Sequence, residues 1–238
     1  IDIINPDEPF NAAMFMDEYD KAKDFARQSD KHLIIVGGSS FYLKSMIDGL
    51  SDMPPIGESS RERAIAMIED LGEAYKYLQK IDPTFATSIT PTDTYRISRG
   101  LEIFFETGDA PSDVFLKAPK KKIDSDIKIL EITTNRELLR GRIGRRTEKM
   151  FELGIVDEAK SISSKYGSEV KPMKSIGLKE VYGYLNGEYD IKMCKELITI
   201  HTSQLAKRQT TFNKTQIKAD IRGDIREVQS AAESLLSV

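Results

Sequence analysis

Residues 32–46, HLIIVGGSSFYLKSM, join a short apolar run to a glycine turn and then to a helical pattern. The run at 33–36 has the length of a buried strand, and a helical apolar rhythm precedes it over residues 12–29. Alternating apolar residues at positions 1–4 indicate an earlier strand or strand exit. A series of strand, helix, strand and helix is typical of a parallel sheet covered by helices, so the sequence predicts an α/β fold.

Between residues 51 and 116 the strand signal gives way to helical patterns. The stretch GESSRERAIAMIEDL places a serine cap before a periodic run, and a later pattern carries Ile97 and Leu101 on one face and stops at Gly108. The segment DIKILEI, residues 126–132, then resumes the sheet. We therefore predict an α/β core in 1–50, an all-helical insertion in 51–116, and the second part of the core, with C-terminal helices, in 117–238.

Capping residues bound two long helices of the second half. Thr134 and Glu137 have the spacing of a capping box, and Gly154 lies where a C-terminal glycine would end the same helix. Asp190 is placed to cap a second long helix, whose inner face begins at Cys194.

Charge is divided unevenly along the chain. Residues 1–116 carry 21 acidic and 11 basic residues, whereas residues 117–238 carry 17 acidic and 24 basic ones. The basic half is therefore where we look for a polyanion. The longest apolar runs are four or five residues, too short to span a membrane, and the single cysteine fits a reducing cytosol. We expect a soluble, cytoplasmic protein.

The strongest local signal is a group of four cations within eight residues, Arg142, Arg145, Arg146 and Lys149. Arg142, Arg146 and Lys149 share one face of the predicted helix. Two interpretations fit this spacing. The face is either solvated, or it is a phosphate clamp, because guanidinium groups bind phosphate oxygens in pairs.

Further cations form separated spots: Lys207, Arg208, Lys214 and Lys218 near the end of the last long helix, Lys174 and Lys179 around SIGL, and Arg96 and Arg99 beside Tyr95. The first of these groups also complements the helix dipole, so a purely structural role remains open. Separated basic spots with an aromatic residue among them are typical of a surface that follows a nucleic-acid backbone and stacks an occasional base.

The sequence shows no metal site. His32 and His201 are isolated from any carboxylate pair at ligand spacing, so we interpret both as structural. No GxxxxGK[ST] phosphate loop occurs, and GGSS at 37–40 lacks its lysine. Taken alone, this turn is a strand-to-helix corner that offers backbone N–H groups and two hydroxyls.

Six ordered blocks are similar to those of the bacterial tRNA dimethylallyltransferases, also called tRNA isopentenyltransferases. They are IDIINPDEPFNAAMF, LIIVGGSSFYLKSMIDGL, DTYRISRGLEIFFETG, RIGRRTEKMFELGIVDEAKSI, SIGLKEVYGYLNGE and QLAKRQTTF. The resemblance covers nearly all 238 residues. It implies a P-loop NTPase-like parallel sheet core with an all-helical insertion, N-terminally truncated, because the family's phosphate loop and its aspartate general base would lie before Ile1.

The resemblance implies an enzyme that moves a dimethylallyl group from dimethylallyl diphosphate to the exocyclic N6 amine of the adenosine 3′-adjacent to the anticodon. Its partners would be a tRNA anticodon stem-loop and dimethylallyl diphosphate, without a membrane, and the protein would be a monomer. Mg²⁺ is the implied cofactor, with ligands upstream of Ile1 and none in this chain. With phosphate loop and base upstream, we expect the chain alone not to turn over.

Site residues follow from the matched motif positions. Arg146 matches the family arginine that contacts the diphosphate and would be catalytic, and Arg142 is a weaker candidate for the same contact. Ser39 replaces a usual threonine near the reacting adenine, and would act in both catalysis and tRNA binding. The matched tRNA-contacting positions besides Ser39 are Arg61, Tyr95, Arg96, Ile97, Ser98, Arg99, Lys174, Ser175, Ile176, Gly177, Leu178, Lys179, Lys207, Arg208 and Gln209.

Some positions depart from the family pattern. Thr94 replaces a common proline, Leu178 a common tyrosine and Phe212 a usual tryptophan, which could signal a divergent substrate preference. Two alternatives stay open. A noncatalytic tRNA- or RNA-binding fragment predicts salt-dependent RNA binding without affinity for dimethylallyl diphosphate. A nucleotide kinase-like phosphotransferase would need the phosphate-loop lysine and a nucleoside pocket.

Overall fold

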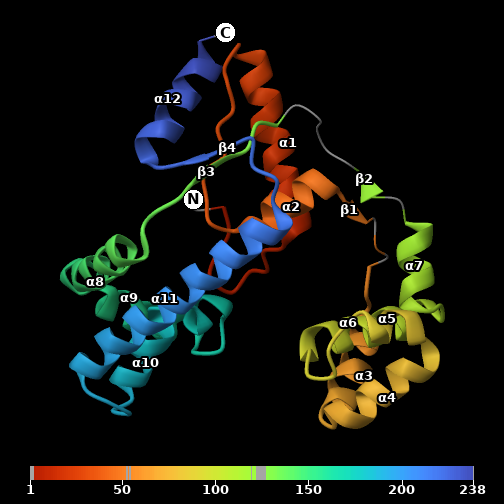
Figure 1. Cartoon of the computed structure of the whole chain (residues 1–238). Coiled ribbons are helices and arrows are strands. Elements are labelled where there is room, and N and C mark those ends of the chain that lie inside the picture. Colours follow the sequence, from red (N-terminus) through yellow and green to blue (C-terminus); the bar gives the residue numbers. More distant parts are fainter. Residues whose placement is uncertain (1–2, 52, 54, 119, 122–126, 238) are drawn as a thin grey trace. The chain divides into compact units, whose positions relative to one another are not determined.

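The computed structural model of the chain describes residues 3–51, 53, 55–118, 120–121 and 127–237 (Figure 1). The chain forms two compact units. Unit 1 combines Ile1–Ser45 with Asp126–Val238, and unit 2 is Met46–Ser125. The residues expected to form an all-helical insertion, 51–116, all lie within unit 2.

Unit 1 is a helical assembly around a small sheet. Its elements in chain order are α1 (Ala12–Gln28), the start of α2 (Ser40–Asp48), β3 (Leu130–Ile132), α8 (Arg136–Glu152), α9 (Ile155–Tyr166), the 3-10 helix η1 (Lys171–Lys174), α10 (Leu178–Leu185), α11 (Ile191–Gln216), β4 (Ile221–Gly223) and α12 (Ile225–Leu236). Residues from α9, η1, α10 and α11 share one apolar core, which contains Ala159, Met173, Val181, Cys194 and Ile198.

The sheet of unit 1 is parallel, as the sequence predicted. β3 pairs with β4, and Leu130, Glu131 and Ile132 lie opposite Ile221, Arg222 and Gly223. The Asp220 carboxylate extends this pairing by accepting a hydrogen bond from the Ile129 N–H at 2.8 Å. β4 was not predicted, although its short apolar alternation after a long helix is a recognisable strand signal.

The strand predicted at 33–36 is not formed in the structure. These residues pair with no strand in the described part of the chain, and their apolar side chains are exposed, with Ile34 at 64% and Val36 at 90%. A strand depends on hydrogen bonds to a neighbouring strand, and none of the described strands pairs with these residues. Residues 3 and 4 form a bend, so they are not part of a strand, whereas the alternative of a strand exit stays a prediction because residues 1 and 2 lie outside the described residues.

Of the segment 126–132, only Leu130–Ile132 is a strand, and residue 126 lies outside the described residues. The pairing with β4 covers these three residues only.

Three predicted caps were tested by the structure. Asp190 caps α11 as predicted, because its side chain accepts a hydrogen bond from the Met193 N–H at 2.8 Å. At α8 the cap is Asn135 instead of Thr134, because the Asn135 side chain reaches the Glu137 N–H at 2.8 Å. Gly154 follows this helix with a φ of +95°, in the left-handed region that glycine favours.

Unit 2 consists of short helices and one two-strand ribbon. The elements are α3 (Glu58–Ile68), α4 (Leu71–Ile81), α5 (Pro83–Thr87), α6 (Thr94–Thr107) and α7 (Pro111–Lys117), with β1 (Leu50–Ser51) antiparallel to β2 (Lys120–Lys121). The predicted stop of α6 at Gly108 is confirmed, with a φ of +75°.

The serine cap predicted for α3 is wrong, since Ser59 and Ser60 lie inside the helix. Glu106 of α6 takes its place by accepting a hydrogen bond from the Gly57 N–H at 2.9 Å. This amide, followed by the Ser60 hydroxyl, lowers the pKa of the Glu106 carboxyl below its ordinary value. A contact from a distant helix thus replaces a local cap.

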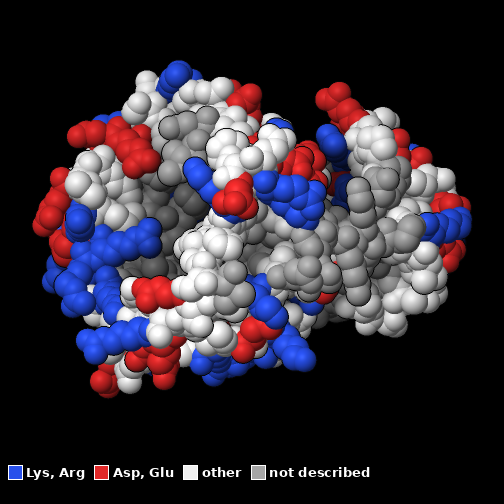
Figure 2. Space-filling view, turned by 90° about the horizontal axis from the view of Figure 1, so that it is seen from above, with Lys and Arg blue, Asp and Glu red and all other residues white. Residues whose placement is uncertain are grey.

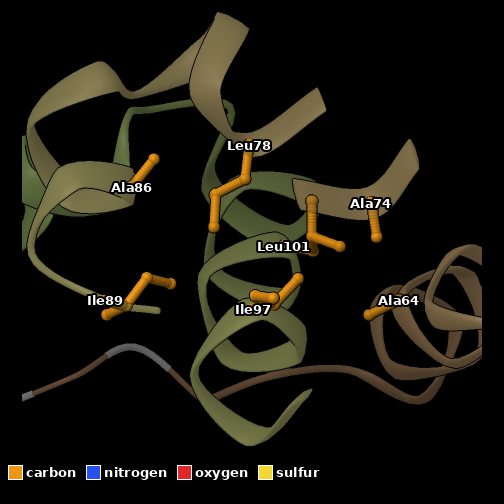
Figure 3. Packing of buried hydrophobic residues seen from close by; sticks show 7 residues of the cluster. All are labelled: Ala64, Ala74, Leu78, Ala86, Ile89, Ile97 and Leu101. Atoms are coloured by element: carbon orange, nitrogen blue, oxygen red, sulfur yellow. The ribbon is translucent and has the colours of Figure 1, made fainter. Parts of the chain in front are cut away.

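The core of unit 2 joins α3, α4, α5 and α6 through small and branched side chains (Figure 3). Leu78, Ile97 and Leu101 are fully buried there. Gly100 permits the close approach of α6 to α5, because a Cβ at this position would lie 2.7 Å from the Phe85 ring. The amphipathic face predicted for α6 is therefore the face that holds this unit together.

Candidate functional site

The turn at 37–40 contacts the C-terminal half of α11. The Gln209 Nε2 donates a hydrogen bond to the Gly38 carbonyl at 2.9 Å. Ser39 is exposed, and its own carbonyl accepts the Tyr42 N–H at 2.9 Å, which opens α2. Two predicted site residues, Ser39 and Gln209, are thus brought together although they are far apart in the sequence.

The basic face of α8 points away from the core of unit 1. Ile143 and Thr147 are buried, and the Thr199 hydroxyl of α11 donates to the Thr147 hydroxyl at 3.3 Å. This contact orients the helix. Arg142, Arg145, Arg146 and Lys149 are exposed, and none of them has an ion pair or hydrogen-bond partner for its side chain among the described residues. Figure 2 shows Lys and Arg side chains gathered at the side where α8 lies in Figure 1. The face is therefore free to bind an anion.

The turn between η1 and α10 carries the predicted positions 174–179. Lys174 and Lys179 are exposed, and Lys174 Nζ lies 3.0 Å from a Glu169 oxygen. Gly177 has φ +106° and ψ −69°, a conformation that L side chains rarely adopt. A Cβ there would lie 3.2 Å from the Met150 side chain of α8, so the turn packs against the helix of the basic face.

A carboxylate that the sequence did not single out supports this turn. Glu180 is 3% exposed and accepts the Gly177 N–H at 2.6 Å. Its other oxygen lies 2.7 Å from His201 Nδ1, a contact that the sequence analysis did not predict. The Gly177–Glu180 capping-box spacing was a usable signal for the first contact. Nothing in the sequence signals the second, because it joins two different helices.

In unit 2 the predicted contact positions divide between surface and core. Arg61 and Arg96 are exposed, and Tyr95 is 79% exposed at the start of α6. Arg99 pairs with Glu102 at 2.9 Å. Ile97 is fully buried, so its side chain supports the helix that presents Tyr95 and Arg96.

The cations of the cluster near the end of α11 divide between the helix surface and a shallow hollow. Lys207 and Arg208 are exposed on the helix. A hollow of about 440 Å³ is lined by Lys214, Lys218, Arg222 and the residues between Lys214 and Ala219. The Arg222 guanidinium is already paired with Glu131 at 2.6 Å. This hollow contains none of the matched family positions, so we do not assign it to the reaction.

Cys194 of α11 is fully buried in the apolar core of unit 1. Burial, and secondarily the negative charge of Glu180, raise the pKa of the thiol to about 11. The thiolate is the reactive species, so the thiol stays unreactive near neutral pH. We expect iodoacetamide at about pH 8 to leave Cys194 unmodified in the folded protein and to label it in urea. Rapid labelling without denaturant, measured by mass spectrometry, would contradict this burial.

Two further properties concern metal and membrane binding. In the part of the chain that the structure describes, no group of three or more His, Cys, Asp or Glu residues could hold a metal ion. None of the helices described here is both long and apolar enough to cross a lipid bilayer.

Comparison with known proteins gives a consistent result. Residues 1–216 match the model of the IPP transferase family. The chain is 46% identical over 217 residues to a tRNA dimethylallyltransferase of Wolinella succinogenes, covering 91% of this chain and 72% of the relative. A tRNA dimethylallyltransferase of Sulfurovum sp. is 42% identical over 231 residues, covering 96% of this chain and 76% of the relative.

Solved structures share the fold. The full-length tRNA isopentenylpyrophosphate transferase of Bacillus halodurans is 26% identical, with a TM-score of 0.64 and coverage of 100% of this chain and 76% of that one. A eukaryotic dimethylallyltransferase acting on tRNA reaches a TM-score of 0.77 at 24% identity, over 96% of this chain and 62% of that one.

Proposed function

Because this chain belongs to the IPP transferase family, we propose that it carries out the reaction for which its relatives are named, the transfer of a dimethylallyl group to tRNA. The donor is dimethylallyl diphosphate, and the acceptor is the N6 amine of the adenosine 3′-adjacent to the anticodon. One structural observation carries the proposal: the outward face of α8 presents Arg142 and Arg146 without partners in the described chain.

The chemistry explains what such a face contributes. The N6 lone pair attacks C1 of the donor, the C1–O bond breaks, and the diphosphate leaves with the bonding electrons while N6 releases one proton to a base. The leaving group gains negative charge as the bond breaks. A guanidinium held in place stabilises this charge more in the transition state than in the ground state, and this difference accelerates the reaction. We assign that role to Arg146, with Arg142 one helical turn away.

The acceptor side of the proposal rests on the turn that carries Ser39. Gln209 holds this turn through the Gly38 carbonyl, so the exposed Ser39 hydroxyl is presented from a restrained backbone. The adenine must leave the stacked loop to reach a donor, as enzymes that act on bases generally require. A hydroxyl on a fixed turn is suited to hydrogen-bond such a base.

The remaining contacts are proposed for the RNA backbone. Exposed cations bind phosphates without reading sequence, and an exposed aromatic ring stacks a base. The exposed cations and the exposed aromatic ring among the matched positions are Arg61, Tyr95, Arg96, Lys174, Lys179, Lys207 and Arg208.

The metal cofactor, the cellular compartment and the oligomeric state are also proposals. Mg²⁺ would accompany the diphosphate, and among the described residues no group of His, Cys, Asp or Glu fits a metal ion. The cytoplasm is the compartment we propose, since it contains the tRNA substrate. We also propose that the protein works as a monomer.

The direct test incubates the protein with labelled dimethylallyl diphosphate and an anticodon stem-loop that carries adenosine 3′ of the anticodon. We expect label in the RNA when the assayed protein carries the phosphate loop and base that the resemblance implies before Ile1, and none for residues 1–238 alone or when that adenosine is replaced by guanosine. A protein that binds the stem-loop with steep salt dependence but neither binds the diphosphate nor transfers label would be a noncatalytic RNA-binding protein.

Tyr95→Ala is expected to weaken binding of the stem-loop by about 10- to 100-fold, because base–aromatic stacking contributes about 1–3 kcal/mol per base. Tyr95→Phe keeps the ring and should bind as the unmodified protein does. Titration by fluorescence anisotropy measures both affinities. Equal affinities for the alanine and phenylalanine variants would show that Tyr95 stacks no base.

A further inference from the structure

Glu180 is a buried carboxylate whose two oxygens each have a defined partner. One accepts the Gly177 N–H at 2.6 Å, and the other lies 2.7 Å from His201 Nδ1. The Glu180 carbonyl also accepts the Tyr189 hydroxyl at 2.8 Å, which fixes the first turn of α10. Burying a charge is unfavourable unless it is paired and hydrogen-bonded, so this arrangement is specific.

The backbone that Glu180 holds has a conformation that favours glycine. Gly177 has φ +106° and ψ −69°, which L side chains rarely adopt. The hydrogen bond to Glu180 is one contact that fixes this turn. Close packing is the other, because a Cβ on Gly177 would lie 3.2 Å from Met150 and 3.4 Å from Ile155. The turn is therefore held at a fixed place beside α8 and the start of α9.

Exposed cations lie in the two elements that this turn joins and on the helix against which it packs. Lys174 and Lys179 flank it, and Lys149 precedes Met150, the α8 residue that packs on Gly177. Lys149 and Lys179 have no acidic partner in the described residues, and the Lys174–Glu169 pair is highly exposed. Exposed pairs contribute little, so Lys174 can exchange Glu169 for a phosphate.

We propose that Glu180 and His201 are positioning residues for RNA binding: they hold the Gly177 turn so that Lys174 and Lys179 are presented to a phosphate backbone next to Lys149. This inference rests on the proposed function, since it takes tRNA as the partner. Stability alone does not explain the pair, because replacing both partners of a buried hydrogen bond by apolar groups of similar shape can be nearly neutral.

The direction in which Glu180→Leu changes stem-loop affinity distinguishes a positioning role of Glu180 from an effect of its charge alone. Glu180→Leu removes a negative charge, which by electrostatics alone should raise affinity for a polyanion. Positioning predicts the opposite, a loss of about 10-fold in stem-loop affinity, because the lysines are no longer held in register. Glu180→Gln keeps an acceptor for the Gly177 N–H and should stay within about 3-fold of the unmodified protein. Glu188→Leu makes the same charge change at an exposed site and should not weaken binding.

A double-mutant cycle with Lys179→Ala completes the test. In the unmodified protein, Lys179→Ala should lower the affinity about 10-fold. In the Glu180→Leu background it should lower the affinity less than about 3-fold, because the turn that presents Lys179 is already released. Additive losses, or a Glu180→Leu variant that binds as tightly as the unmodified protein, would overturn the proposal. If Glu180→Leu does not fold, the same cycle in a His201→Ala background decides, with the same non-additivity expected.

The two proposals fail in different ways. If the unmodified protein does not bind the stem-loop at all, the proposed function fails, and this inference fails with it. If the unmodified protein binds and transfers the prenyl group while the cycle is additive, only the positioning role is rejected. A thermal unfolding curve for each variant confirms that affinity is compared between folded proteins.

Discussion

Replacement of Arg146 by alanine is expected to slow prenyl transfer by about two orders of magnitude or more. A single group that stabilises developing negative charge typically contributes about 10²–10³ in kcat. Arg146 is exposed, while its neighbours Ile143 and Thr147 anchor α8 in the interior, so alanine should change the stability little. Single-turnover assays in the full-length protein, with saturating stem-loop, measure the rate.

Arg140→Ala is the matched control for this prediction. It removes the same charge from the same helix, and Arg140 is also exposed, but its spacing of six residues places it on another face. We expect its rate to stay within about 3-fold of the unmodified enzyme, because the charge is lost at a distance from the leaving group. If both variants, or neither, slow the transfer, Arg146 has no specific role in stabilising the diphosphate.

Leu78→Ala is expected to destabilise unit 2 by about 2–5 kcal/mol, the usual cost of emptying a buried leucine site. Leu78 of α4 is fully buried. It lies within the cluster of Figure 3, where α4 packs against α6. The cavity would loosen α6, which presents Tyr95 and Arg96. Urea unfolding monitored by circular dichroism measures the change in free energy.

Leu116→Ala in the same unit is the control for Leu78→Ala. Leu116 is exposed, so the same truncation should change the free energy of unfolding by no more than about 0.5 kcal/mol. Stem-loop affinity should fall for Leu78→Ala and stay unchanged for Leu116→Ala. A Leu78→Ala protein of unchanged stability would show that the α4–α6 packing is not the core of this unit.

The features predicted correctly from the sequence are mostly local. The Asp190 cap, the glycine stops at Gly108 and Gly154, and the buried face of α6 each depend on residues within about one or two helical turns. The family was also predictable, because six blocks in a fixed order carry far more information than any one of them.

The incorrect predictions share a physical cause, which is dependence on distant partners. The run at 33–36 has strand-forming residues, yet a strand needs a neighbour, and the described strands provide none. The cap of α3 comes from Glu106, some 49 positions away. A local pattern cannot reveal which distant group satisfies a backbone N–H.

The sequence by itself therefore determined the buried face of α6, the Asp190 cap of α11, the glycine stops after α6 and α8, the excess of cations in the second half and the family to which the chain belongs. Only the tertiary structure decided which of these residues meet: Gln209 with the Gly38 carbonyl, and His201 with the buried Glu180. The reason is that helix periodicity and capping are set by short-range sterics and hydrogen bonds. The pairing of residues far apart in the chain depends on how whole helices pack, which no short stretch of sequence specifies.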